Sequence, residues 1–115
     1  MFAPAFTTGY IPFSNGTNLT VDAAYFWDNS NKRLGVGTST PVSSIEVQKN
    51  SLGVTPSLTD GLTLRNTTAA GAGAQQKSPS LWLQGQGWKT TATAASQSVT
   101  MGMEVLPVQG SSAPS

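Results

Sequence analysis

The chain of 115 residues contains no cysteine and no histidine. Without cysteine it can form neither a disulfide nor a thiolate metal site. Without histidine it lacks the side chain most often used for general acid–base catalysis near neutral pH. Six basic and five acidic residues give a net charge of +1, and the basic residues form no patch of the kind that binds nucleic acid. We therefore expect no enzyme, no metal or cofactor and no nucleic-acid partner.

Large apolar side chains are also few. The hydrophobic 37% of the chain includes 12 alanines, which leaves 31 larger apolar residues, whereas Thr 15, Ser 14, Gly 12 and Pro 7 dominate the composition. Such a chain supports one small domain at most. Residues 1–21 carry no charge, but prolines and polar residues interrupt them, so they match neither a signal peptide nor a membrane span. We expect no membrane insertion, and a lean β fold or an obligate assembly.

The clearest local signal is a β-hairpin over residues 25–36. Residues 25–27 are aromatic and favour strands. Four turn formers follow at residues 28–31, and Leu34 and Val36 then alternate with glycine. This pattern predicts two strands joined by a four-residue loop, with Leu34 and Val36 on one face.

Two further features surround this hairpin. Gly35 and Gly37 lie on the face opposite Leu34 and Val36, where we expect another backbone to approach closely or the strand to bend. Residues 44–48 alternate again and predict a third short strand that buries its apolar side chains. Those side chains are Ile45 and Val47.

The second half of the chain alternates most regularly near its end, where seven positions keep a two-residue period. The apolar members are Val99, Met101, Met103 and Val105. We expect them to face a core, with Glu104 exposed to solvent or paired with a basic side chain such as Lys89. Leu81 and Leu83 begin another strand, and residues 58–65 predict one more. Residues 66–76, rich in Gly and Ala, read as a flexible loop.

The composition changes along the chain and divides it into three segments. Residues 1–18 form an apolar, Pro- and Gly-containing N-terminal docking segment. Residues 19–57 form a β-hairpin module. Residues 58–115 form a second β segment with the Gly/Ala-rich loop, which we expect to continue beyond residue 115 in a longer chain.

Two groups of residues resemble structural modules of phage tail fibres and other virion fibres. The first reads Phe-Trp-Asp-Asn at residues 26–29, Leu-Gly-Val-Gly-Thr at 34–38 and Thr-Pro at 40–41. The second reads Gly-Gln-Gly-Trp-Lys at residues 85–89. The resemblance implies a homotrimeric, β-rich structural segment, usually part of a longer chain that ends in a receptor-binding tip.

Acidic side chains suggest two other kinds of site. Asp22, Asp28, Asn29 and Asn31 carry oxygen atoms of the type that bind Ca²⁺, but no bidentate glutamate stands at the expected distance. Asx side chains in a tight loop commonly bond their own backbone, and we favour that interpretation. Glycoside hydrolysis needs two carboxyl groups held across a sugar, and none of the acidic residues stands in a recognisable setting for it.

Tryptophan offers a third kind of site, because its flat ring can stack on a sugar. Burial in a core is the competing role for Trp27, Trp82 and Trp88. Trp82 is the candidate for glycan contact, since it points opposite to Leu81 and Leu83 in an alternating strand.

Taken together, these patterns predict an all-β fold of short strands and hairpins, and the resemblance implies that they form intertwined or β-sandwich-like segments of a trimeric fibre. We expect a structural component of a phage tail fibre or related virion appendage that supports host attachment. Its partners would be copies of itself, other virion proteins bound through residues 1–18, and host surface glycans. The predicted assembly core is Leu34, Val36, Ile45, Val47, Val99, Met101, Met103 and Val105.

Two other functions remain open. A stand-alone carbohydrate-binding module would be a monomer with a preformed aromatic platform. A capsid or tail decoration or adaptor protein would dock mainly through residues 2–13.

Overall fold

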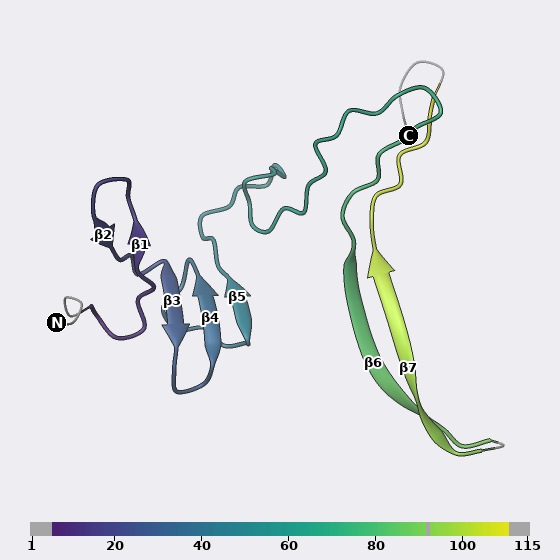
Figure 1. Cartoon of the computed structure of the whole chain (residues 1–115), viewed down its shortest axis with the longest axis horizontal. Coiled ribbons are helices and arrows are strands. Elements are labelled where there is room, and N and C mark those ends of the chain that lie inside the picture. Colours follow the sequence, from purple (N-terminus) through teal and green to yellow (C-terminus); the bar gives the residue numbers. More distant parts are fainter. Residues whose placement is uncertain (1–5, 92, 111–115) are drawn as a thin grey trace. The chain divides into compact units, whose positions relative to one another are not determined.

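The computed structural model describes residues 6–91 and 93–110, and its regular elements there are all β-strands (Figure 1). The all-β prediction is therefore confirmed. In the described ranges no helix is long and apolar enough to cross a membrane. The chain forms two compact units, Met1–Thr63 and Leu64–Ser115. The described strands are β1 (Phe13–Ser14), β2 (Leu19–Thr20), β3 (Tyr25–Asp28), β4 (Arg33–Val36), β5 (Ile45–Val47), β6 (Leu81–Lys89) and β7 (Ala95–Met103).

The predicted hairpin is formed by β3 and β4, which pair antiparallel. Tyr25 lies opposite Val36, and Trp27 lies opposite Leu34. The loop is one residue later than expected, because Asp28 is still in the strand and pairs with Arg33. The aromatic strand, the turn formers and the Leu-Gly-Val strand thus all favour the same hairpin.

The third predicted strand, β5, pairs parallel with β4. Residues 37–44 make the connection, which is shorter than the roughly dozen residues that a parallel crossover usually needs. This short loop crosses the glycine face of β4. A Cβ added to Gly35 would collide with the backbone carbonyl of Thr38, and Thr38 is itself buried. The expected close approach of another backbone at Gly35 is confirmed.

The N-terminal part of the first unit adds to the other edge of this sheet. The backbone N–H of Trp27 donates to the carbonyl of Gly9 (2.6 Å), and that of Ile11 donates to the carbonyl of Tyr25 (3.0 Å). The ring of Tyr10 packs edge-on against Phe26 on the same face as Gly35. The expected division after residue 18 falls inside the small hairpin of β1 and β2, because this hairpin joins the two sides of that division.

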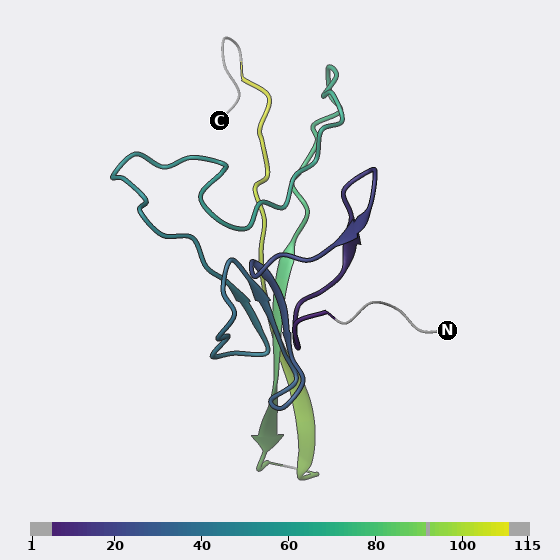
Figure 2. The ribbon, with the colours of Figure 1, turned by 90° about the vertical axis from the view of Figure 1, so that its left-hand side faces the viewer.

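The second unit consists mainly of one long hairpin, in which β6 and β7 pair antiparallel along nine positions and run side by side as a twisted ribbon (Figure 2). Residues 66–76 form a loop outside any strand, with a single isolated bridge between Gly71 and Ala74. The strand expected over residues 58–65 is wrong. Those residues are extended or turn without a paired strand, because alternating leucines cannot form a ladder without a neighbouring backbone.

The close packing at Gly35 predicts the effect of a single methyl group. Gly35→Ala should destabilise the protein by about 1–3 kcal/mol, the usual cost of overpacking, because the Cβ displaces the Thr38 backbone. Gly53→Ala is the matched control, since no atom lies within 4 Å of a Cβ there. Thermal unfolding of the two variants should show a lower Tm for the first alone. Equal Tm values would show that the loop does not pack on β4 as described.

Candidate functional site

One face of the three-stranded sheet is entirely apolar. Side chains opposite one another in the two ladders share a face. We call this set the first apolar face: Tyr25, Trp27, Leu34, Val36, Ile45 and Val47. It contains the four residues that the sequence assigns to assembly in this unit and adds two aromatic ones, Tyr25 and Trp27. The hairpin register was the signal that could have identified these two.

The first apolar face is open to solvent in the chain. Ile45 is 67% exposed and Val47 43% exposed, while Leu34 and Val36 are half-buried. The single chain does not bury Ile45 and Val47, which were expected to face inward, because the loop after β4 packs on the opposite face of the sheet. Within the described ranges, no hydrophobic side chain is fully buried. The role of these residues in assembly remains a prediction.

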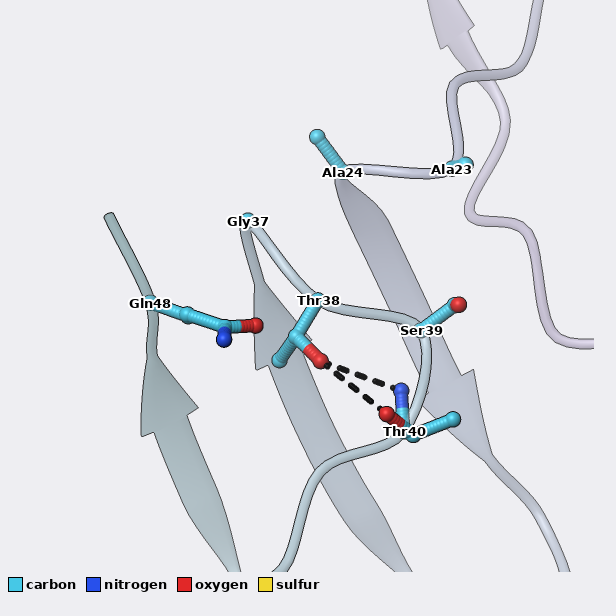
Figure 3. A pocket seen from close by; sticks show the side chains of 7 residues that line it. All are labelled: Ala23, Ala24, Gly37, Thr38, Ser39, Thr40 and Gln48. Atoms are coloured by element: carbon cyan, nitrogen blue, oxygen red, sulfur yellow. Dashed lines mark hydrogen bonds between the residues drawn. The ribbon is translucent and has the colours of Figure 1, made fainter. Parts of the chain in front are cut away.

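The opposite face of this sheet borders a shallow pocket of about 370 Å³ formed largely by the loop after β4 (Figure 3). The hydroxyl of Thr38 accepts a hydrogen bond from the backbone N–H of Thr40 (3.1 Å) and lies 3.5 Å from the Thr40 hydroxyl. The remaining lining is small or uncharged, with the amide of Gln48 at one side. The pocket offers hydroxyl and amide groups but no carboxylate or base, so it supplies no acid–base pair.

The carboxylate of Asp28 organises the hairpin loop. It accepts hydrogen bonds from the backbone N–H groups of Ser30 (3.0 Å) and Asn31 (3.1 Å) and from the side-chain amide of Asn31 (2.8 Å). Hydrogen bonds from the Asn31 side chain and backbone lower the pKa of Asp28 below its ordinary value. Asp22 likewise accepts a bond from the backbone N–H of Ala24 (2.7 Å). The Asx-turn interpretation is confirmed, since both carboxylates bond their own loops.

The β6–β7 ribbon of the second unit also has one apolar face, here called the second apolar face. Its register places five large apolar side chains toward one end of that face: Leu81, Leu83, Val99, Met101 and Met103. Toward the other end the same face continues with smaller or polar residues: Gly87, Gln97, Lys89 and Ala95. The predicted strand is confirmed. The single chain provides no core for it, because Met101 and Met103 are each 56% exposed and the ribbon has no second layer among the described residues. Val105 lies beyond the end of β7 and is exposed as well.

The other side of the ribbon is polar and aromatic. We call it the polar–aromatic face, and its β6 members are Trp82, Gln84, Gln86 and Trp88, opposite Gly102, Thr100, Ser98 and Ser96. The register confirms that Trp82 lies on the face opposite Leu81 and Leu83. Sequence reasoning did not single out the glutamines. Their signal was the continued alternation of β6 beyond Leu83.

Beyond the Leu81 end of the ladder, polar side chains bond across the two segments that flank the ribbon. Glu104 accepts bonds from the ammonium of Lys77 (2.8 Å) and the hydroxyl of Ser80 (2.6 Å). The expected pairing of Glu104 with a basic side chain is confirmed, but the partner is Lys77 and not the suggested Lys89, which lies opposite Ala95 at the far end of the strands. Hydrogen bonds from Lys77 and then Ser80 lower the pKa of Glu104 below its ordinary value.

Comparison of the chain with models of protein families, with curated proteins and with solved structures finds no match. The functional argument therefore depends on the residues and their geometry. In the described ranges, no group of three or more acidic residues stands together as a metal site. The most distinctive surfaces are the two apolar faces and the polar–aromatic face.

The Glu104 cluster predicts a pH dependence. Because folding lowers the pKa of Glu104, its stabilising contribution is fully present above its ordinary value of 4.5 and is lost as pH falls through the lower folded-state pKa. Thermal unfolding should show Tm falling as the solution is acidified below that value. Glu104→Gln should have a lower Tm at neutral pH and a smaller fall on acidification. Parallel Tm profiles for the two proteins would contradict the described ion pair.

Proposed function

We propose that the chain is a non-enzymatic structural module that works as an assembly of identical copies. The observation that carries this proposal is that each of its two larger sheets has one face made of large apolar side chains, and that both faces are exposed. Contiguous exposed apolar patches on proteins mark interaction surfaces. A second layer supplied by another chain would give each sheet the core that its own chain does not provide.

Energetics support an assembled state. A two-stranded hairpin is at best marginally stable in water, and a sheet needs a packed hydrophobic face to persist. Burial of apolar surface contributes about 25 cal/mol per Å², whereas a backbone hydrogen bond contributes only about 1 kcal/mol net. The nine paired positions of β6 and β7 therefore do not account for a stable ribbon without cover on Leu83, Met101 and their neighbours.

The nature of the assembly comes from the resemblance to virion fibres. It supports a homotrimer in a phage tail fibre or related appendage of the virion, where the module projects the fibre and supports host attachment. In such a fibre the apolar faces of three copies meet and form a shared core. Residues 1–18 would bind other virion proteins. An adaptor or decoration protein would dock through the same part of the chain. The polar–aromatic face favours a second candidate function, a carbohydrate-binding module.

The first prediction from this proposal is the mass in solution. The purified chain should scatter light as a species of three times 11.9 kDa at micromolar concentration. The reason is that burial of both apolar faces outweighs the entropy lost on association. A folded monomer at that concentration would contradict the proposed function.

A pair of neighbouring substitutions tests which face is buried. Leu83 and Gln84 are adjacent and both exposed, but they lie on opposite faces of β6. Leu83→Asp should destabilise the assembly by about 3–5 kcal/mol per chain, because it buries an unpaired carboxylate. Gln84→Asp, which adds the same charge on the other face, should leave the mass unchanged. Light scattering of both variants decides the matter. Dissociation by Gln84→Asp alone would reverse the assignment.

The first apolar face can be tested in the same way. Ile45 is well exposed in the chain, so Ile45→Asp should be harmless to an isolated molecule. In an assembly that covers this face, the substitution should lower the Tm markedly and reduce the mass. Ser44→Asp, one residue earlier and also exposed, is the control that should change neither. If Ile45→Asp also changed neither, residues 6–63 would lie outside the interface.

A further inference from the structure

The polar–aromatic face of β6 and β7 is unlike the rest of the chain's surface. Its two indoles are the most exposed aromatic side chains of the described residues, with Trp82 at 64% and Trp88 at 67%. An indole that stays in water does not gain the favourable free energy that burial of its apolar surface against a partner would give. Because the ribbon has two faces and the large aliphatic side chains occupy the other one, these tryptophans are not part of the second apolar face.

Trp82 is held in place by a glycine across the ladder. A Cβ added to Gly102 would stand 2.9 Å from atoms Cε3 and Cζ3 of the indole, so the ring packs directly against the Gly102 backbone. Packing of an aromatic ring on a cross-strand glycine fixes the ring close to the sheet. The result is a flat apolar surface that stays open on its outer side.

Beside this ring runs a ladder of amide and hydroxyl groups. The amide of Gln86 donates to the hydroxyl of Ser98 (3.0 Å), and its carbonyl accepts from the hydroxyl of Ser96 (3.2 Å). The amide of Gln84 lies 3.5 Å from the Thr100 hydroxyl. Each carboxamide has two N–H donors and a carbonyl with two lone pairs, so both retain capacity for a ligand. Cross-strand bonds hold these groups in position before any ligand binds.

The face carries no charged side chain, which excludes recognition by charge pairing. A sugar ring matches what is present, because it has an apolar C–H side for an indole and hydroxyls for amides. Trp82 and Trp88 are six residues apart, about 20 Å along a strand that rises ~3.3 Å per residue, a span suited to several linked sugars. The ribbon twists, so the strip between the two rings winds around it.

We propose that the polar–aromatic face binds a neutral oligosaccharide, with Trp82 stacking on a sugar ring and with Gln84 and Gln86 binding its hydroxyls. Trp88 contacts the same chain farther along. This activity goes beyond assembly and does not require it, because the face belongs to a single ribbon. In an assembly that covers the second apolar face, the polar–aromatic face is the one left outside.

Indole resonances offer a direct test on the full chain, since Trp27 lies on a different face from Trp82 and Trp88. Tryptophan labelled with ¹⁵N is followed by NMR while four neutral probes are added separately: cellohexaose, maltohexaose, fully N-acetylated chitohexaose and linear mannohexaose. At least one of them should shift the Nε1–H signal of Trp82 and, more weakly, that of Trp88. Trp27, on the first apolar face, is the internal control and should not move. No shift of Trp82 with any of the four probes would overturn the proposal.

Variants separate stacking from folding and assembly. Trp82→Ala should weaken binding of the active probe by about tenfold or more, as for an aromatic hot-spot residue. Trp82→Phe, which keeps a ring over Gly102, should retain a measurable part of it. Light scattering on the same samples should give the mass of the unmodified protein in both variants. If Trp82→Ala changed the mass, the face would be a contact between copies, and the oligosaccharide proposal would fail. A monomeric protein that binds the probe would contradict only the proposed assembly.

Discussion

In the proposed assembly, stability depends on burial of the apolar face of each sheet, which the single chain leaves exposed. The strands within each unit already pair with one another: β4 pairs on both edges, and β6 and β7 pair with each other along their whole length. Backbone hydrogen bonds alone contribute little net free energy, because the unfolded chain bonds water equally well. The hydrophobic contribution is the dominant one, and the side chains that would provide it lie at the surface of both units.

The two faces of the β6–β7 ribbon have opposite chemistry, and this division connects the assembly with the proposed ligand. Leucine and methionine on one side suit contact with another protein chain, since they carry no hydrogen-bonding requirement. Indole, amide and hydroxyl groups on the other side suit a ligand that is both apolar and hydroxylated. In the first unit the division differs, because the loop at Thr38 already packs over Gly35 and leaves only the face with Ile45 free.

Much of the local structure could be predicted from the sequence, because the signals are local. The turn formers after Trp27 and the alternation of Leu34 and Val36 define the first hairpin, and the period around Met101 defines β7. The parallel pairing of β5 could not be predicted, since alternation identifies a strand but not its neighbour. The same limit explains why Lys77, distant in sequence, is the partner of Glu104. Alternation also predicts which side chains share a face without showing what covers that face.

In the proposed assembly, folding and association form a single equilibrium, so thermal stability depends on the concentration of the protein. The most direct test is the Tm of the full chain measured by circular dichroism over a hundredfold range of concentration. If copies of the chain supply the missing layer, the Tm rises with concentration, because association stabilises the folded state by mass action. A Tm that stays constant over that range in a cooperative transition would show that the single chain is stable with its apolar faces uncovered, and would contradict the proposed assembly.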